Sequence, residues 1–174
     1  MDEILAFQNV SMTYYTKTDE TDAVRDLSFA VKQGEFVAIL GPSGCGKTTI
    51  LSLISGLLRP TEGQILRNGS PMNEQSAAIG YMLQHDHLFE WRTIRKNITL
   101  GLEIQKKQTA ENLRYIELLL EKYGLRQFQK HYPHQLSGGM RQRAALIRTL
   151  ALKPDLLLLD EPFSALDFQT RMQV

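Results

Sequence analysis

The feature that most constrains the fold of this chain is a glycine-rich segment at residues 41–48, which reads GPSGCGKT. An apolar run, FVAIL at residues 36–40, precedes it, and the helix-forming residues TIL follow it at 49–51. This order predicts a buried strand, a turn, and a helix that begins at about Gly46. Glycine has no Cβ, so successive backbone N–H groups in such a turn can converge on an anion. The segment therefore predicts a phosphate cradle, with an ordinary glycine-rich turn as the alternative.

The spacing of this segment is that of a P-loop: a glycine, four residues, then Gly46, Lys47 and Thr48. In that pattern Lys47 lies on the β- and γ-phosphates of a nucleotide, and the Thr48 hydroxyl lies on Mg²⁺. The start of the helix directs unsatisfied amides and the positive end of its dipole at the same anion. We predict nucleotide contacts from Gly41, Pro42, Ser43, Gly44, Cys45, Gly46, Lys47, Thr48 and Thr49.

Composition limits the alternatives. The chain has 174 residues, a formal net charge of +1 and 43% hydrophobic residues, which suits one globular domain. The small net charge argues against binding nucleic acid through broad phosphate neutralisation. Cys45 is the single cysteine, so no intrachain disulfide forms. Since no apolar run approaches the roughly 18–20 residues that span a bilayer, we expect the chain itself to be cytosolic.

Strands are predicted at residues 4–15, 23–31 and 64–67, where apolar and polar residues alternate or β-branched residues gather. A polar segment at 16–22 makes the turn between the first two, so they predict an antiparallel β layer ahead of the P-loop. Tyr14 either places its ring against an adenine or only packs on the strand, and the residues alone favour packing.

A further strand is predicted at residues 79–83, and it ends on Gln84. A polar and aromatic loop follows at 85–92. Exposed aromatic side chains in a loop suggest a docking surface, while the alternative is that they pack inside the helical region. The side chains concerned are Leu88, Phe89 and Trp91.

Residues 93–132 have a helical composition. Thr109 is a predicted N-cap, and Gly124 is a predicted helix stop. The residues predicted to share the apolar face of this helix are Leu113, Ile116 and Leu120. We interpret the region as a helical insertion between two α/β pieces.

A second glycine-containing helix start lies at residues 136–143, which read LSGGMRQR. The two glycines expose backbone N–H groups at the start of a helix predicted to run through Leu150. The sequence therefore predicts a second helix start that faces an anion, in addition to that of the P-loop helix.

An apolar run at residues 156–159 ends in two adjacent carboxylates, Asp160 and Glu161. The run is apolar on both faces, as a central parallel strand should be. One carboxylate can attend Mg²⁺ while its neighbour activates water. The alternative is a solvated acidic turn.

With these pieces in order, the chain resembles the ATP-binding cassette (ABC) family, the ATPase subunits of ABC transporters. Residues 41–48 match the Walker A motif of that family, 136–142 its signature and 156–161 its Walker B motif. Gln84 matches the Q-loop glutamine, and residues 164–167 match the D-loop.

The resemblance implies an α/β fold. Its parts are a P-loop NTPase core of the ABC-type ATPase kind, an N-terminal antiparallel β layer and a helical subdomain insertion, truncated after the D-loop. It implies a single ABC ATPase domain over residues 1–174, incomplete at the C-terminus. Within that domain, residues 1–84 and 154–174 form the nucleotide-binding core, and 85–153 form the helical insertion with the signature motif.

The resemblance also implies roles for individual residues. Phe7, Val10, Ser11 and Tyr14 follow the family's spacing to its adenine-stacking aromatic, which assigns that role to Tyr14. In the family, ATP lies between the P-loop of one subunit and the signature of another, so a homodimer is the catalytic unit. The signature residues that would serve the opposite subunit's γ-phosphate are Ser137 and Gly139, and Gly138 between them is also implied to bind the nucleotide. The implied catalytic residues are Glu161, Gln84 and Lys47. The implied Mg²⁺ ligands are Thr48, Gln84 and Asp160.

The loop at residues 88–93 resembles that of importer subunits of the nitrate, sulfonate and taurine group, although Glu90 stands where those usually carry a proline. The resemblance therefore implies a subunit that binds and hydrolyses ATP for an importer of small anionic or sulfonate-like solutes. Its implied partners are transmembrane permease subunits and, indirectly, a solute-binding protein, with no nucleic acid. Its implied place is the cytoplasmic face of the cell membrane, as a peripheral subunit.

Two rival readings remain. DNA-maintenance ATPases share the same half-sites, but they insert long coiled coils where this chain has one short helical unit. The second rival is a non-hydrolysing nucleotide-binding fragment. Members of the resembled family continue into a strand that ends in a switch histidine, whereas this sequence stops at Val174. That strand would lie between the Walker A and Walker B strands, so we expect an unpaired central sheet and poor hydrolysis.

Overall fold

The computed structural model describes residues 3–72 and 79–162. The chain forms two compact units, residues 1–77 and 78–174. Within the described ranges, no helix is both long enough and apolar enough to cross a bilayer. The predicted division into a nucleotide-binding core and a helical insertion remains a prediction.

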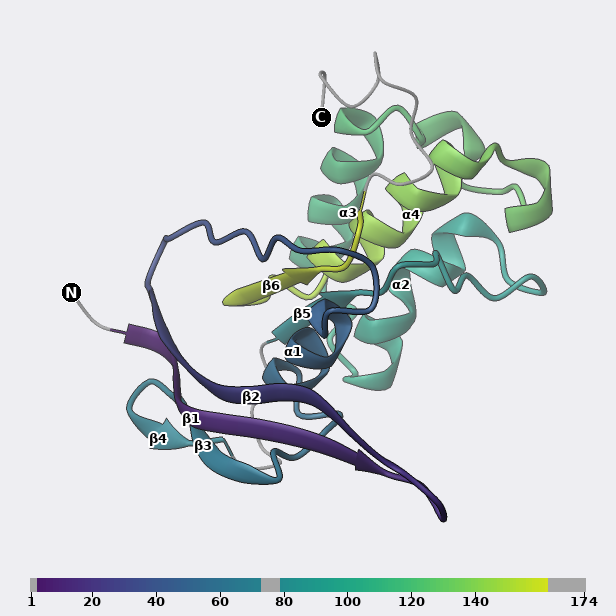
Figure 1. Cartoon of the computed structure of the whole chain (residues 1–174). Helices are drawn as coiled ribbons and strands as arrows, with labels where there is room; N and C mark the ends of the chain where they lie inside the picture. The colour runs from purple at the N-terminus through teal and green to yellow at the C-terminus, as the bar shows by residue number, and fades with distance from the viewer. Residues whose placement is uncertain (1–2, 73–78, 163–174) are drawn as a thin grey trace. The chain divides into compact units, whose positions relative to one another are not determined.

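The first unit is built on a four-stranded antiparallel sheet whose strand order is β2-β1-β3-β4 (Figure 1). Its strands are β1 (Glu3–Tyr15), β2 (Glu20–Lys32), β3 (Glu62–Arg67) and β4 (Ser70–Pro71). The antiparallel β layer predicted ahead of the P-loop is therefore confirmed. The turn between β3 and β4 is made by Asn68 and Gly69, which both have positive φ (48° and 76°), as a tight hairpin requires.

The register of this sheet places apolar side chains on one another. Phe7 in β1 lies opposite Phe29 in β2 and Ile65 in β3, and the rings of Phe7 and Phe29 stack with centroids 4.6 Å apart. Val10 is fully buried, and Leu5 is 2% exposed. Burial of these side chains in β1, the strand bonded on both sides, holds the layer together.

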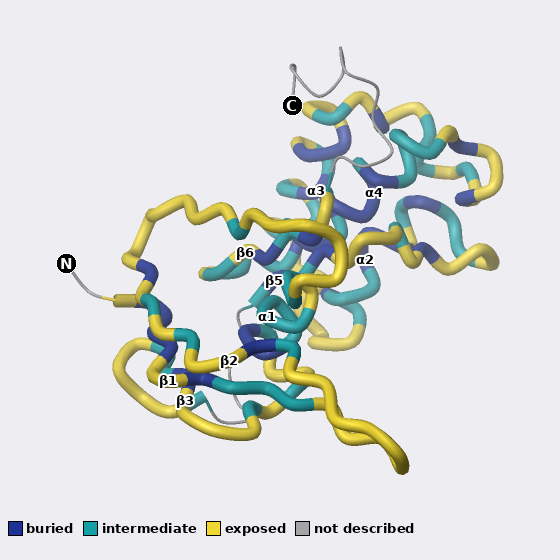
Figure 2. Tube along the Cα trace, viewed as in Figure 1, coloured by how far each residue is buried: buried dark blue, intermediate teal, exposed yellow. Residues whose placement is uncertain are grey.

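The apolar run at residues 36–40 differs from its prediction. It forms no strand, and the side chains at its two ends, Phe36 and Leu40, are each 89% exposed. Figure 2 shows the long connection from β2 to the helix α1 (Lys47–Ile54) as exposed almost throughout. The buried strand predicted here is therefore wrong for this structure. The physical reason is that a strand needs a neighbour to accept its backbone hydrogen bonds, and the described residues supply none for this run.

The second unit combines a two-stranded parallel sheet with a helical bundle. Its strands are β5 (Ile79–Met82) and β6 (Leu156–Leu159), paired in parallel from Ile79 opposite Leu156 to Met82 opposite Leu159. Its helices are α2 (Ile94–Ile104), α3 (Ala110–Lys122), η1 (Arg126–Phe128), η2 (Pro133–Gln135) and α4 (Gly138–Leu150). The predicted helical stretch and the predicted helix through Leu150 are both present.

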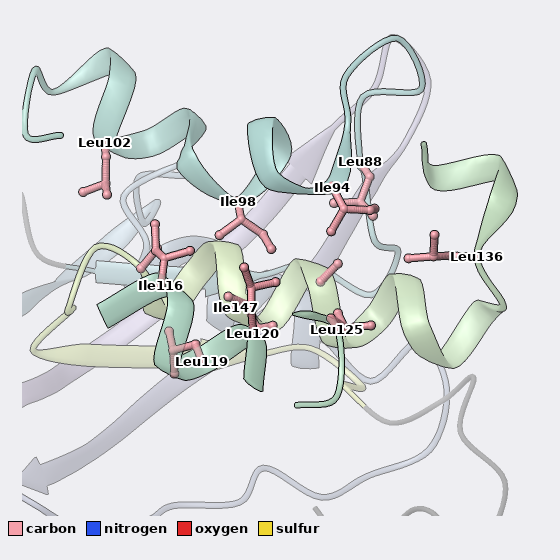
Figure 3. Close-up of a cluster of buried hydrophobic side chains, with 12 residues drawn as sticks. Leu88, Ile94, Ile98, Leu102, Ile116, Leu119, Leu120, Leu125, Leu136 and Ile147 are labelled. Carbon is pink, nitrogen blue, oxygen red and sulfur yellow. The ribbon is translucent and has the colours of Figure 1, made fainter. Parts of the chain in front are cut away.

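One apolar cluster holds the bundle together. Figure 3 shows Ile98 of α2, Leu120 of α3 and Ile147 of α4 among the side chains that form it, and all three are fully buried. Ile116 and Leu120 share the buried face predicted for α3. Each fully buried side chain of this size stabilises the bundle by roughly 1.5–3 kcal/mol relative to exposure.

The ends of α3 follow the predicted signals. The Thr109 hydroxyl accepts a hydrogen bond from the backbone N–H of Asn112 (3.2 Å). At the other end Gly124 has φ +69°. Its N–H donates to Glu121, and the N–H of Leu125 donates to Leu120, which is the Schellman pattern. The start and stop of this helix were therefore readable from the sequence.

The side chains predicted to form a docking surface in the loop after Gln84 differ in their exposure. Leu88 is 8% exposed and belongs to the core of the bundle, so for this side chain the predicted exposure is wrong and the alternative, packing inside the helical region, holds. Trp91 is 76% exposed, and its ring lies 5.0 Å from that of Phe89. The N–H of Leu88 donates to the Asp86 carboxylate (3.2 Å), and its side chain belongs to the cluster that contains Ile94 and Ile98 of α2.

Candidate functional site

The first part of the candidate site is the phosphate loop, which lies in the first unit. It leads into α1 through Gly46, whose φ of 94° is a left-handed conformation that favours glycine. A Cβ at Gly46 would also lie 2.4 Å from the carbonyl oxygen of Ala23 in β2. The turn into the helix therefore depends on glycine at this position for two separate reasons.

Lys47 folds back over the loop. Its Nζ donates hydrogen bonds to the carbonyl oxygens of Gly41 (2.8 Å) and Pro42 (2.7 Å), and it lies 3.9 Å from the Cys45 Sγ. The ammonium group is thereby held inside the glycine-rich turn. A cation in this position is suited to bind an anion that the loop encloses. Ser43, Gly44 and Thr48 lie exposed in the same segment.

Tyr14 lies beside the helix that follows the loop. Its hydroxyl is 3.3 Å from the Thr49 Oγ1, and its side chain is 39% exposed. The bond fixes an aromatic ring next to the first turn of α1. This position is compatible with the adenine-stacking role, which stays a prediction.

The second part of the candidate site lies at the ends of β5 and β6 in the second unit. Gln84 Nε2 donates a hydrogen bond to Glu161 Oε2 (3.0 Å). Because β5 and β6 are parallel, their carboxyl ends meet at one edge. The residue after β6, Asp160, is 5% exposed, and its N–H donates to Met82 (2.9 Å). Two predicted catalytic residues, 77 positions apart, are thus brought into contact.

Glu161 has φ +48°, an uncommon conformation for a residue with a side chain. Such strain persists only where the surroundings hold it, and it is frequent at functional sites. It turns the Glu161 carboxylate, which is exposed, toward Gln84. Asp160 and Glu161 therefore differ sharply in burial although they are adjacent.

The donor set suits Mg²⁺. Asp160 carries a carboxylate, and Gln84 carries an amide oxygen, Oε1, beside the Nε2 that donates to Glu161. Carboxylate and amide oxygens are the hard ligands that Mg²⁺ takes. Thr48, the third predicted ligand, lies in the first unit at the start of α1. The residues present therefore fit the metal in kind.

The signature segment forms the start of α4. Ser137 is the N-cap, and its hydroxyl accepts a hydrogen bond from the N–H of Met140 (3.3 Å). Gly138 and Gly139 are the first two residues of the helix. Ser137 is exposed, so the helix start presents a hydroxyl and backbone amides at the surface, as an anion site requires.

Sequence reasoning missed a set of contacts that fasten the segment after Gln84 to α4. The Arg148 guanidinium donates to the carbonyl oxygens of Asp86 and His87, each at 2.7 Å. Arg141 Nε donates to the Asp86 carboxylate at 3.1 Å. Burial lowers the pKa of Arg148 from its usual value, while attraction to Asp86 opposes that effect. The available signal was that positions 141 and 148 lie two helical turns apart and so share a face.

One predicted motif cannot be placed. The D-loop at residues 164–167, and the helix expected to begin near Phe168, lie outside the described residues. The phosphate loop with Tyr14 lies in the first unit, and Gln84, Ser137, Asp160 and Glu161 lie in the second. The contacts that the structure provides are therefore those within each unit.

The fold and these motifs define the class of protein. The family described as ABC transporter matches residues 24–164. The chain belongs to this family, and the α/β fold predicted for it is confirmed by its likeness to solved cassettes of the same kind.

Three relatives show which proteins this chain is similar to: one is uncharacterised, and two are named as import proteins. The chain is 52% identical over 170 residues to an uncharacterized ABC transporter ATP-binding protein, YtlC of Bacillus subtilis, covering 98% of this chain and 65% of that protein. It is 44% identical over 168 residues to the taurine import ATP-binding protein TauB of Pelagibacter ubique, covering 96% and 63%. It is 46% identical over 155 residues to the sulfate/thiosulfate import ATP-binding protein CysA of Synechocystis, covering 87% and 44%. The chain thus spans less than two thirds of the length of these relatives.

A solved structure extends the comparison. The ATP-binding cassette MJ0796, in a dimeric post-hydrolysis state bound to ADP and Pi, matches with a TM-score of 0.86 and 33% sequence identity. The match covers 97% of this chain and 78% of that one.

Proposed function

We propose that this chain binds ATP with Mg²⁺ and hydrolyses it, as the energising subunit of an importer. The observation that carries the proposal is the hydrogen bond from Gln84 to Glu161 beside the buried Asp160. A carboxylate paired with an amide and a second carboxylate is suited to orient water and metal together. The phosphate loop with its folded Lys47 supplies the matching anion site.

The residues would divide the work as follows. Lys47 and the loop amides stabilise charge on the phosphates. Glu161 accepts a proton from the attacking water or polarises it, and Gln84 holds that carboxylate in place. Thr48, Gln84 and Asp160 would hold Mg²⁺, which would supply charge neutralisation at the phosphate oxygens. Chemistry of this kind rests on positioning and electrostatics.

The proposed assembly is a homodimer in which Ser137 and Gly139 reach the γ-phosphate of the opposite subunit. The dimeric state of the MJ0796 cassette, named in its description, supports this arrangement. Glu161→Gln is the variant of choice for testing it, because it keeps the shape of the side chain but removes the base. We expect this variant to dimerise with ATP and Mg²⁺ in analytical ultracentrifugation, whereas Ser137→Arg in the same background stays monomeric.

The proposed solute class is a small anion such as a sulfonate or sulfate, supported by the taurine and sulfate/thiosulfate import relatives. The proposed partners are permease subunits at the cytoplasmic face of the membrane, and a solute-binding protein indirectly. Trp91, 76% exposed beside Phe89, is the side chain we propose for permease contact. A photo-crosslinker at position 91 is expected to capture a co-expressed permease, while one at Leu118, 60% exposed on α3, is not.

A second candidate is a nucleotide-binding chain that does not hydrolyse. It is favoured by the exposed, unpaired apolar run at residues 36–40. Phosphate release from ATP with Mg²⁺, compared between the chain and Glu161→Gln, decides between the two. Release well above that of the variant supports hydrolysis. Equal release, with binding of a fluorescent ATP intact, supports the second candidate.

A further inference from the structure

The segment that follows Gln84 is bonded to the signature helix rather than to the sheet. Arg148, near the end of α4, donates through two nitrogens to the carbonyl oxygens of Asp86 and His87. Arg141, two turns earlier on the helix, donates to the Asp86 carboxylate. The other Asp86 oxygen accepts the N–H of Leu88. Four hydrogen bonds therefore converge on three consecutive positions of the loop.

The forked guanidinium group of Arg148 is suited to bonding two neighbouring carbonyl oxygens at once. Two carbonyl oxygens at equal distance suit a planar guanidinium, whereas an ammonium group is a point donor. His87 has φ +44°, a left-handed conformation that side chains rarely adopt without support. The two bonds on either side of this turn supply that support.

Gln84 lies between two fixed points. On one side, β5 ends at Met82, whose carbonyl accepts the N–H of Asp160 (2.9 Å). On the other side, Asp86 is fastened to α4. Only Leu83 separates Gln84 from Met82, and only His85 separates it from Asp86. The position of the Gln84 side chain against Glu161 therefore depends on both anchors.

The helix that provides the second anchor is packed into the core of the bundle. α4 is a 13-residue helix whose Ala144 and Ile147 are fully buried in the core of the bundle. It carries Ser137 and the two signature glycines at its start. A packed helix transmits a displacement of one end to the other because interiors are close-packed.

We propose that Arg148, acting with Arg141 and Asp86, is a positioning residue that joins the signature helix to Gln84 and holds Gln84 against Glu161. The catalytic part of this inference rests on the proposed function. The hydrogen bonds of Arg148 and Arg141 with Asp86 and His87, which we call the clamp, belong to the fold itself. A displacement of the helix caused by contact at Ser137 would thereby change the positions of Gln84 and Glu161 in the same chain. A side chain that only stabilised the bundle would have no effect on Gln84.

The clamp is tested by hydrogen exchange on the purified chain. Arg148→Lys keeps the charge and removes the fork, and Asp86→Asn keeps an acceptor for Leu88 but removes the ion pair. Arg126→Gln is the matched control, because Arg126 pairs at the surface with Glu121, with both side chains about two-thirds exposed. We expect the peptide covering residues 84–91 to exchange about tenfold faster in the two clamp variants than in the control. Equal exchange in all three would overturn the proposal.

The effect on Gln84 is measured by NMR of its side-chain amide, assigned by its loss in Gln84→Ala. In the parent chain, Glu161→Ala is expected to shift this signal, because the Gln84 amide donates to Glu161. In Arg148→Lys the same change is expected to leave the signal where it was. A full shift in both backgrounds would show that Arg148 does not position Gln84. This measurement does not require hydrolysis.

Steady-state kinetics test whether Arg148 affects catalysis through Gln84. Arg148→Lys is expected to lower kcat about tenfold with KM for ATP within about twofold, since misplacement affects chemistry more than binding. An unchanged kcat would reject the positioning role. If the parent chain shows no hydrolysis above Glu161→Gln, the proposed function fails, and the NMR result still decides whether Arg148 places Gln84.

Discussion

Lys47 is the residue whose environment bears most directly on ligand binding. Its ammonium group donates hydrogen bonds to two backbone carbonyl oxygens of its own loop, those of Gly41 and Pro42. A phosphate is a stronger partner for a cation than a neutral carbonyl. Exchange of the carbonyl contacts for phosphate contacts therefore favours binding.

Lys47→Ala should weaken nucleotide binding, because an enclosed polyphosphate would lose its main counter-charge. We expect a loss of at least about 2 kcal/mol, or roughly 30-fold in affinity. Titration of a fluorescent ATP analogue measures it. Lys153→Ala is the control, since Lys153 pairs with Glu111, and it should bind as the parent does. Equal affinity of Lys47→Ala and the parent would contradict the P-loop assignment.

Gly46 and Gly34 provide a matched pair for testing the loop geometry. Both have positive φ, +94° and +76°, but a Cβ at Gly46 would meet a carbonyl oxygen of Ala23 at 2.4 Å, while nothing lies within 4 Å at Gly34. Gly46→Ala should therefore destabilise the chain by about 1–2 kcal/mol more than Gly34→Ala. Urea unfolding gives both values. Equal losses would mean that backbone strain alone matters.

At the scale of elements, α2 is joined to the loop before it by a buried amide. Asn97 is fully buried, its Oδ1 accepts the N–H of Phe89 (2.7 Å), and its Nδ2 donates to the carbonyls of Phe89, Arg92 and Thr93. One side chain thus satisfies the backbone of a loop that has no regular structure of its own.

Asn97→Ala should be strongly destabilising, because it removes a fully buried amide and leaves part-buried backbone groups of the loop without this partner. We expect a loss of about 2–3 kcal/mol in the free energy of unfolding. Asn112→Ala is the control, since Asn112 is half-buried and donates through its side chain to Lys107 alone. Thermal and urea unfolding of both variants measure the difference. A loss at Asn97 no larger than at Asn112 would refute the role given to this amide.

The C-terminal end of α2 carries a pH-dependent contact. The hydrogen bond from Arg92 is the main cause that lowers the pKa of Glu103 below its ordinary value of 4.5, and Thr99 adds a further bond (2.9 Å). A carboxyl whose pKa is lower in the folded than in the unfolded chain stabilises the fold above the unfolded pKa. That stabilisation is lost as pH falls through the folded pKa.

Glu103→Gln should therefore reduce the free energy of unfolding near pH 7 by less than about 1 kcal/mol, given the partial exposure of the pair. The difference from the parent should shrink toward zero well below pH 4.5. Urea unfolding across this range tests both statements. Glu121→Gln, at an exposed pair with Arg126, should show no difference at any pH. A pH-independent loss in Glu103→Gln would exclude the ionic cause.

At the scale of the whole molecule, the two units differ in how completely their elements are paired. The first unit holds a regular sheet, yet its apolar run at residues 36–40 is exposed and unpaired among the described elements. The two strands of the second unit are bonded to each other and are covered by α4 through Met82 and Leu146. Exposed apolar backbone without a ladder is prone to pair with other chains.

Phe36→Ser should reduce self-association of the chain, because it removes the aromatic ring of the unpaired run at residues 36–40. Light scattering at rising protein concentration is expected to show fewer aggregates than for the parent. Leu57→Ser, at an apolar side chain that is 69% exposed outside the run, serves as the control and should change little. Equal scattering of Phe36→Ser and the parent would mean that the run is protected in solution.

The sequence by itself determined the local features. The glycines and Lys47 of the P-loop, the cap at Thr109, the stop at Gly124 and the alternation in the first strands each depend on neighbours within a few residues. Backbone preference, capping and side-chain period act at that range, so a pattern in the sequence is enough to predict them.

Only the tertiary structure decided what depends on distant partners. The contact of Gln84 with Glu161 joins positions far apart in the chain, and the fork of Arg148 on the loop spans 61 and 62 positions. The run at residues 36–40 has the composition of a buried strand but forms none, because strand formation requires a neighbouring strand. Leu88 was predicted on a docking surface, with packing inside the helical region as the alternative, and it lies in the core among side chains of other elements. Long-range hydrogen bonds and burial decide such features, and a linear pattern does not encode them.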